Sequence, residues 1–322
     1  MLNLKSSIMR TLQQLFLLTA VIGLLFSCSK EDEFFTKKSA SPQYGYENVK
    51  PIVHGLDQDR FVTMQVINTN GQLIDLKVHY RIIGQGPVDM VWIPGWTNPL
   101  TMFTKQLDYF RDKAKSNYID LPGHGLSDAP EGIEYTQGLM ADAIYNIIKK
   151  EGVKKFIGVG HSWGSSPLKQ FEIKHPGMIT QLVLLDVGIP TWPPMNQATR
   201  EAIYSTQMAW TVANKTPVVT PAIDAEYYEI AKYFMGFPNW LLANMYYNWF
   251  DEEACKPYPW TIPVLGIWRT MNPANEAIMN QHFPGVEIHV IGGTYHVIQW
   301  FQADIVNQLI DDFMADRPGK NY

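Results

Sequence analysis

The feature that most constrains the fold is the pentapeptide Gly160-His-Ser162-Trp-Gly164. It follows the apolar residues 156–159, a run of strand length, and it precedes an amphipathic segment that predicts a helix from Ser165. A serine on a sharp strand-to-helix turn presents its hydroxyl at the edge of a sheet, and small residues two positions away on either side let the flanking backbones approach. The pattern predicts a nucleophilic Ser162 on a turn for which Gly160 and Gly164 leave room.

From about residue 60 the chain alternates short apolar runs with helix-length amphipathic segments, which favours βαβ units on a mostly parallel sheet. Asn70-Gly71 predicts the turn of an antiparallel hairpin. Eight strands are expected, at residues 61–67, 74–83, 88–93, 116–119, 156–159, 182–185, 264–268 and 286–291. Helices are expected at residues 136–151, 165–175, 275–281 and 302–315.

The spacing of these elements breaks between Val187 and Pro259, where some 70 residues separate two strands that one helix would ordinarily join. Residues 189–260 contain 15 aromatic side chains among 72 residues, about a fifth, against 13% for the whole chain. This composition predicts a cap inserted after the sixth strand. Its aromatic side chains either line an apolar ligand cavity or bury the insertion against the main domain, and both interpretations stay open.

The N-terminal segment has the pattern of an export signal. Two basic residues precede a nearly uncharged apolar run at residues 12–26, and Leu-Phe-Ser leads into Cys28. The run has 15 residues, whereas a membrane-spanning helix takes about 20. The pattern therefore predicts a signal peptide over residues 1–27, with an uncleaved anchor helix as the alternative.

This segment resembles the signal sequence and lipobox of bacterial lipoproteins, and the acidic Glu31-Asp-Glu33 resembles the surface-export signal of Bacteroidetes lipoproteins. The resemblance implies a lipid on Cys28 that attaches the protein to a membrane of the cell envelope, either periplasmic or surface-exposed. Residues 28–59 are mostly polar and predict a flexible tether, and the acidic cluster fits a plain solvated linker equally well. The folded domain is then expected over residues 60–322.

Three motifs together resemble the α/β-hydrolase superfamily. The first is the serine pentapeptide, the second is Trp92-Ile-Pro-Gly-Trp96, and the third is Asp120-Leu-Pro-Gly-His-Gly-Leu-Ser-Asp128. The resemblance implies a mostly parallel eight-stranded sheet flanked by helices, with a helical cap after strand six. It also implies an oxyanion hole formed by the backbone N–H groups of Trp96 and Trp163.

A serine hydroxyl is a weak nucleophile, so it needs a base and an acid that orients the base. His296 follows the last expected strand, which is the histidine position of the resembled family, whereas His161 and His124 are expected to be structural. Relatives place the acid in a loop where this chain has Asn272, and an amide supplies no negative charge.

Asp186 is the preferred acid because it ends a strand next to the strand of Ser162, and active-site groups of parallel sheets gather at that edge. Haloalkane dehalogenases and cofactor-free ring-cleaving dioxygenases of this fold have a similar arrangement. Asn272 as a weakened orienting group, and a residue of the insertion such as Asp251, remain the alternatives.

Composition limits the partners. The chain carries 26 Lys and Arg against 31 Asp and Glu, too acidic for a dedicated nucleic-acid binder, and no protein partner is inferable. Its two cysteines, Cys28 and Cys255, exclude a disulfide framework, and Cys255 is expected to be an unpaired thiol. The histidines show no metal-ligand spacing and there is no phosphate-binding glycine loop, so neither a metal nor another cofactor is expected.

These features predict a serine hydrolase that cleaves a small, largely apolar ester, amide or lactone through an acyl-enzyme on Ser162. One alternative is a cofactor-free dioxygenase-like enzyme that uses the His296 and Asp186 pair as a general base. Another is a non-catalytic binding protein on the same scaffold. Epoxide hydrolase and dehalogenase activities are disfavoured, because those relatives carry aspartate at the position of Ser162.

Overall fold

The computed structural model describes residues 59–187, 197–213, 219–249 and 260–315 of the 322-residue chain. All of them belong to the unit Val49–Tyr322. The expected signal peptide, Cys28, nearly all of the expected tether and Cys255 lie outside the described residues. Within the described residues, no helix is both long and apolar enough to cross a membrane.

The predicted eight-stranded, mostly parallel sheet is confirmed. Its spatial order is β1-β2-β4-β3-β5-β6-β7-β8, with β2 antiparallel to both of its neighbours and every pair from β4 to β8 parallel. The strands are β1 Arg60–Ile67, β2 Leu73–Ile83, β3 Val88–Ile93, β4 Ala114–Ile119, β5 Phe156–His161, β6 Ile179–Leu185, β7 Val264–Trp268 and β8 Glu287–Val290. Their carboxyl ends carry the loops in which the predicted site residues lie.

Strand β5 is longer than the sequence predicts. It continues through Gly160 and His161, because these residues still pair with neighbouring strands, Gly160 with Ile93 of β3 and His161 with Leu185 of β6. The paired backbone therefore runs directly into Ser162, so the position of this serine is set by the centre of the sheet.

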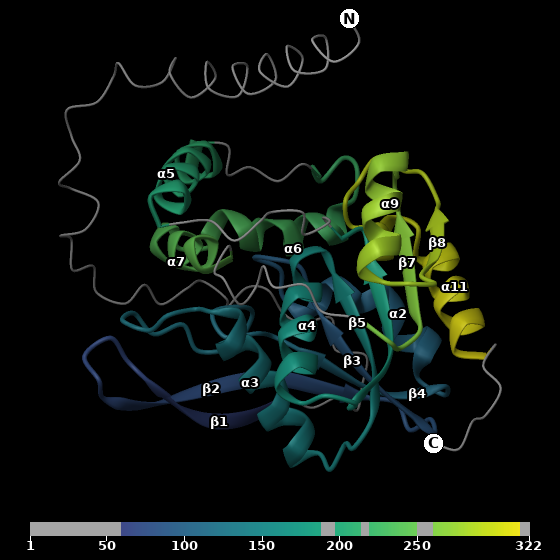
Figure 1. Ribbon diagram of the computed structural model, residues 1–322, viewed down its shortest axis with the longest axis horizontal. Helices are drawn as coiled ribbons and strands as arrows, with labels where there is room; N and C mark the ends of the chain where they lie inside the picture. Colours follow the sequence, from purple (N-terminus) through teal and green to yellow (C-terminus); the bar gives the residue numbers. More distant parts are fainter. Residues whose placement is uncertain (1–58, 188–196, 214–218, 250–259, 316–322) are drawn as a thin grey trace, which may run out of the picture. The chain divides into compact units, whose positions relative to one another are not determined.

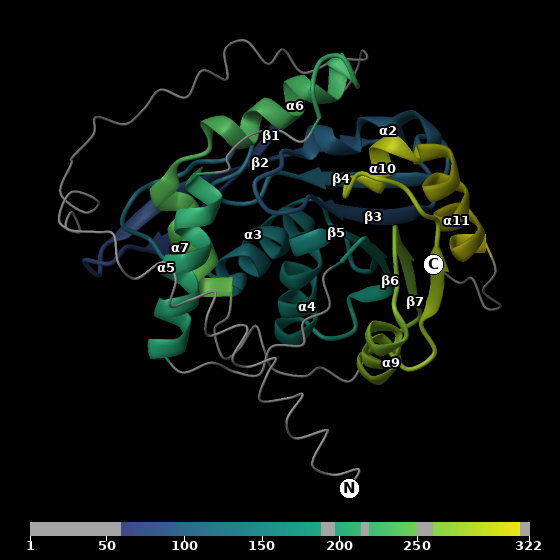
Figure 2. The same cartoon turned by 90° about the horizontal axis from the view of Figure 1, so that it is seen from above.

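Helices cover both faces of the sheet (Figure 2). α3, α4 and α9 lie on one face, and α2, α10 and α11 lie on the other. Their bounds are α2 Thr104–Phe110, α3 Gln137–Lys150, α4 Ser165–Lys174, α9 Pro273–His282, α10 Ile298–Phe301 and α11 Ala303–Ala315, with short 3₁₀ turns η2 Leu100–Phe103 and η3 Ser162–Gly164. α3 begins where the sequence predicts, because the side chain of Thr136 caps it by accepting the Leu139 N–H at 3.1 Å.

An aromatic cluster anchors the strand that leads to the proposed oxyanion loop. The ring of Trp92 in β3 packs against Phe103, Phe110 and Tyr118, with centroids 5.3–5.4 Å apart, and all four side chains are buried. Burying aromatic rings stabilises the fold by a few kcal/mol each, at about 25 cal/mol per Å² of apolar surface. This packing holds the end of β3 in place and so fixes the start of the turn that follows it.

Among the residues that the structure describes between β6 and β7, three helices lie at the carboxyl-end side of the sheet (Figure 1). These insertion helices are α5 Gln197–Ala213, α6 Ala225–Gly236 and α7 Asn239–Trp249. Two aromatic side chains of the insertion pack it against the main domain, since Tyr227 of α6 packs on Trp300 and Phe237, directly after α6, packs on His124. Tyr246 of α7 lies against the ring of Trp96, on the proposed oxyanion loop.

Candidate active site

Ser162 occupies a strained turn between β5 and α4. Its φ is +50°, in the left-handed region that L-residues seldom adopt. A Cβ added at Gly160 would lie 2.8 Å from the Cα of Ser165, and one added at Gly164 would lie 2.4 Å from the carbonyl oxygen of Ile93. Both glycines are therefore needed for the close packing that the sequence predicts at this turn.

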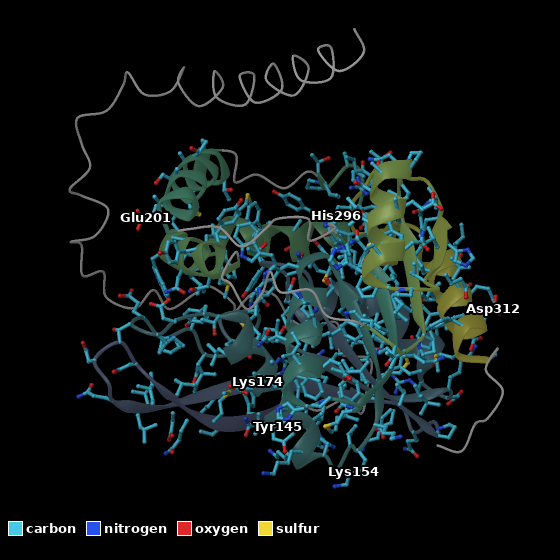
Figure 3. All side chains as sticks on the ribbon, in the orientation of Figure 1. Tyr145, Lys154, Lys174, Glu201, His296 and Asp312 are labelled. Atoms are coloured by element: carbon cyan, nitrogen blue, oxygen red, sulfur yellow. The ribbon has the colours of Figure 1, made fainter. Side chains whose placement is uncertain are left out.

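His296 lies in the loop between β8 and α10, on the side of the sheet that carries the insertion helices (Figure 3). Its Nε2 is 2.7 Å from the Ser162 Oγ, and its Nδ1 is 2.6 Å from the Asp186 Oδ2. Because an ionised carboxylate can only accept, Nδ1–H donates to Asp186 and Nε2 is left to accept the serine proton. The three predicted side chains thus form one hydrogen-bonded chain.

Asp186 follows directly after β6 and its carboxyl group is largely buried. Its φ is +46°, and its backbone N–H donates to the carbonyl of Ile267 at 2.7 Å, which fixes the turn against β7. Burial raises the pKa of this carboxyl, but hydrogen bonds from His296 and Arg269 outweigh it and lower the pKa to about 2. Asp186 is therefore a carboxylate at neutral pH.

Arg269 is the residue of this site that sequence reasoning missed. Its backbone N–H lies 3.0 Å from Asp186 Oδ1, and its Nε lies 2.6 Å from Oδ2, the oxygen that His296 also contacts. Nη1 donates to the carbonyl of Thr294 in the loop that carries His296. The available signal was its position directly after β7, at the sheet edge where active-site groups gather.

The alternative acids lie elsewhere or outside the described residues. Asn272 is the N-cap of α9, and its side-chain oxygen accepts the Asn275 N–H at 2.8 Å. The side chain of Asn272 therefore caps α9. The hydrogen-bond partner of His296 Nδ1 is instead the carboxylate of Asp186. Asp251 lies in residues 250–259, which the structure does not describe.

The turn after β3 passes close to the serine. A Cβ added at Gly95 would lie 3.2 Å from the Ser162 Cβ, so the backbone of this turn lies next to Ser162. The carbonyl of Gly95 accepts the Asn98 N–H at 3.0 Å. Because the peptide bond between Gly95 and Trp96 is trans, the N–H of Trp96 points in the direction opposite to that carbonyl, away from Asn98. Trp163, which supplies the other expected N–H, follows Ser162 in the 3₁₀ turn η3.

His161, for which the sequence predicts a structural role, packs against the ring of His296. It is buried, its ring centroid is 4.7 Å from that of His296, and its Nε2 is 3.0 Å from the carbonyl oxygen of His296. Burial lowers the pKa of His161 to about 3, so its imidazole is neutral and donates Nε2–H to that carbonyl. This hydrogen bond fixes the backbone of the loop that carries His296.

A cavity of about 220 Å³ adjoins the site on the side of Asp186. Its lining residues come from the ends of β6 and β7, the start of α9 and the histidine loop, and they are Asp186, Val187, Trp268, Arg269, Thr270, Met271, Asn275 and His296. Among the residues that the structure describes, no group of three or more His, Cys, Asp or Glu side chains is placed to hold a metal ion.

Comparison with known proteins assigns the fold. The sequence model of the family described as alpha/beta hydrolase fold matches residues 90–213. Epoxide hydrolase 3 of Mus musculus is 25% identical over 307 residues, which cover 82% of this chain and 81% of the relative. This alignment spans most of both proteins.

Two solved structures superpose with a TM-score of 0.62 at 18% identity. One is a thermophilic esterase from Thermogutta terrifontis, matched over 79% of this chain and 98% of that protein. The other is the enol-lactonase from Burkholderia xenovorans, matched over 79% of this chain and 100% of that protein. The chain has the α/β-hydrolase fold, with an eight-stranded, mostly parallel sheet flanked by helices.

Proposed function

We propose that the protein is a serine hydrolase that cleaves a small, largely apolar ester, amide or lactone through an acyl-enzyme on Ser162. The observation that carries this proposal is the continuous hydrogen-bonded chain from Ser162 Oγ through His296 to Asp186, with distances of 2.7 and 2.6 Å. A hydroxyl paired with a neutral imidazole, itself oriented by a carboxylate, is the arrangement that activates a serine for acyl transfer.

The mechanism follows from these contacts. His296 Nε2 takes the proton of Ser162 as the oxygen attacks the carbonyl carbon, and Asp186 stabilises the imidazolium that forms. The backbone N–H groups of Trp96 and Trp163 stabilise the tetrahedral oxyanion. The imidazolium then protonates the leaving alcohol or amine. Water attacks the acyl-enzyme by the same route, which releases the acid and restores the serine.

Epoxide hydrolysis fits this site poorly, although a relative of 25% identity is named for it. A carboxylate that opens an epoxide forms an ester, which water then cleaves. A serine that opened an epoxide would form an ether, and an ether has no carbonyl for water to attack. Ser162 at the elbow therefore favours acyl substrates, in line with the esterase and lactonase among the structural neighbours.

A second candidate is a cofactor-free oxygenase that uses the His296 and Asp186 pair to deprotonate an aromatic hydroxyl. The observation that favours it is the carboxylate at the end of β6, a position that resembles that of the acid in cofactor-free ring-cleaving dioxygenases of this fold. Ser162→Ala separates the two candidates. The hydrolase should lose nearly all turnover, whereas general-base chemistry should survive in part.

The test is the hydrolysis of p-nitrophenyl esters of increasing chain length and of amino-acid arylamides. Wild type should hydrolyse the short esters, and Ser162→Ala should lose about 10³-fold or more in kcat/KM. The matched control is Ser205→Ala, which alters an exposed serine of α5 whose hydroxyl donates to the carbonyl oxygen of Glu201 in the same helix. Equal activity of wild type and Ser162→Ala would overturn the proposal.

We also propose that Cys28 carries a lipid and anchors the protein to a membrane of the cell envelope. The support is the sequence pattern around Cys28, which lies outside the described residues. In a bacterial host, wild type should incorporate labelled palmitate and enter the detergent phase of Triton X-114. Cys28→Ser should do neither, whereas Cys255→Ser should behave as wild type. Palmitate incorporation into Cys28→Ser would contradict this proposal.

A further inference from the structure

His124 is a buried residue whose side chain forms hydrogen bonds with two different loops. Its side chain is fully buried, its Nε2 lies 3.1 Å from the backbone N of Thr97, and its Nδ1 lies 3.1 Å from the carbonyl oxygen of Pro122. Thr97 directly follows Trp96, whose N–H belongs to the proposed oxyanion hole. One imidazole therefore connects the Asp120–Asp128 loop to the turn after β3.

The protonation state of this imidazole follows from its two partners. A backbone N–H can only donate and a carbonyl can only accept, so Nε2 must be the unprotonated nitrogen and Nδ1 must carry the hydrogen. An imidazolium would place a second N–H against that of Thr97. Burial lowers the pKa of His124 to about 4, so the neutral form is present throughout the neutral pH range.

The turn that His124 contacts has a strained backbone, which a hydrogen bond from outside the turn helps to stabilise. Thr97 has φ +63°, a conformation that is costly for a β-branched residue. The carbonyl of Trp96 accepts the Thr97 hydroxyl at 2.6 Å and the Asn98 side-chain amide at 2.9 Å. The peptide between Trp96 and Thr97 is therefore bonded at both ends, and His124 supplies the partner at its N–H end.

The same imidazole also packs on the second loop of the proposed oxyanion hole. The ring of Trp163 stacks on His124, with centroids 5.7 Å apart and an interplanar angle of 22°. Phe237, which directly follows α6, lies on His124 as well, at 5.5 Å. One buried imidazole thus contacts both the residue that follows Trp96 and the side chain of Trp163.

We infer that His124 is a positioning residue, which holds the backbone of Trp96 and the ring of Trp163 so that both N–H groups face the developing oxyanion. The inference rests on the proposed serine-hydrolase function. It assigns a role in transition-state stabilisation to a histidine that makes no contact with the reacting atoms. Losing the hold on Thr97 should lower the rate of serine acylation more than it changes substrate binding.

Two variants of His124 distinguish a role in positioning the oxyanion hole from a general role in stabilising the fold. In His124→Gln the longer amide reaches the site of Nε2 and can accept the Thr97 N–H. In His124→Asn the shorter amide sits near Nδ1, where it can donate to Pro122 but cannot reach Thr97. Both variants are polar and uncharged, and an acceptor for the Thr97 N–H is kept only in His124→Gln. Thr136→Ala, which removes the cap of α3 away from the site, is the stability control.

The measurement is the second-order rate of inactivation by a fluorophosphonate, together with kcat and KM for p-nitrophenyl acetate. We expect His124→Asn to lose about 10- to 100-fold in inactivation rate and in kcat, with KM changed less than about threefold, because one oxyanion donor is worth about 10² to 10³. His124→Gln should stay within about fivefold of wild type, and Thr136→Ala should react as wild type does. Far-UV circular dichroism checks that each variant is folded.

The outcomes separate the inference from the proposed function. Equal rates for folded His124→Asn and wild type, or equal losses in the Asn and Gln variants, would overturn the inference alone. A wild type that never reacts with the probe would overturn the proposed function and this inference with it. Independently of any variant, ¹⁵N NMR of wild type should show Nε2 of His124 unprotonated from pH 5 to 9, and a protonated Nε2 would refute the hydrogen bond to Thr97.

Discussion

The guanidinium Nε of Arg269 lies 2.6 Å from Oδ2 of Asp186, the carboxylate oxygen that also accepts Nδ1–H of His296. The cation of Arg269 and the proposed base His296 therefore both bind the same oxygen of the proposed acid. The charged groups at this point are the Asp186 carboxylate and the Arg269 guanidinium, and burial keeps the neighbouring imidazole of His161 neutral. Arg269 thus offsets part of the negative charge that an imidazolium at His296 would meet.

Arg269→Gln removes this cation and its Nε hydrogen bond to Asp186. The pKa of the Asp186 carboxyl should then rise from about 2 towards its ordinary value, because one of the interactions that lower it is lost. Urea unfolding should therefore show a smaller loss of stability between pH 6 and pH 3 in Arg269→Gln than in wild type, whereas Arg269→Lys keeps the charge and should lose more than Arg269→Gln does. Arg111→Gln is the matched control, because Arg111 is about equally exposed and also pairs with an aspartate. An equal loss in Arg269→Gln and wild type would contradict the expectation.

Asp186→Asn tests the identity of the acid. An amide orients the imidazole poorly and does not stabilise its charge, so kcat for p-nitrophenyl acetate should fall by about 10³- to 10⁴-fold. Asn272→Ala should keep its activity and lose about 1 kcal/mol of stability, since it removes only the cap of α9. Full activity in Asp186→Asn would show that another residue is the acid.

The lowered pKa of Asp186 also makes a prediction about stability. The folded pKa of about 2 is below the ordinary value of 3.8, so the charged carboxylate stabilises the fold above about pH 4. This contribution, on the order of 2 kcal/mol, is lost as pH falls from about 4 to about 2. Urea unfolding at pH 6, 4 and 3 should therefore show a steeper loss in wild type than in Asp186→Asn. Parallel losses would mean that the carboxylate is not held this way.

Gly164→Ala tests the packing of the serine turn. The added Cβ would lie 2.4 Å from the carbonyl oxygen of Ile93, so the turn or the end of β3 must shift. We expect a loss of about 2 to 3 kcal/mol in the free energy of unfolding, together with slower fluorophosphonate labelling. Gly138→Ala in α3 is the control. Its Cβ would meet nothing closer than 3.5 Å, and alanine should leave stability unchanged or raise it by up to about 1 kcal/mol.

Local patterns could predict most of the fold and three members of the candidate site. The apolar run before Gly160, the glycines around Ser162 and the Asn70-Gly71 turn each act over a few residues. Such local patterns indicate strands and turns directly, because no contact with a distant part of the chain is needed to recognise them. Asp186 and His296 could be proposed because the carboxyl ends of parallel strands converge at one edge of a sheet.

The contacts that the sequence could not predict join residues far apart in the chain. Arg269 is 83 positions from Asp186, and His124 is 27 positions from Thr97. Neither pair shares a periodicity or a motif spacing, and each contact depends on how two loops pack above the sheet. The positive φ of Asp186 and Thr97 is likewise set by this packing, because neither residue type by itself indicates a left-handed backbone.

The most direct test of the proposed function is the mass of the intact protein after exposure to a fluorophosphonate. Wild type should gain one phosphonyl adduct, and peptide mapping should place it on Ser162. Ser162→Ala should gain none, and His296→Asn should react at least about 10³-fold more slowly. If wild type gains no adduct under conditions that fully label a reference serine esterase, the protein does not use Ser162 as an activated nucleophile.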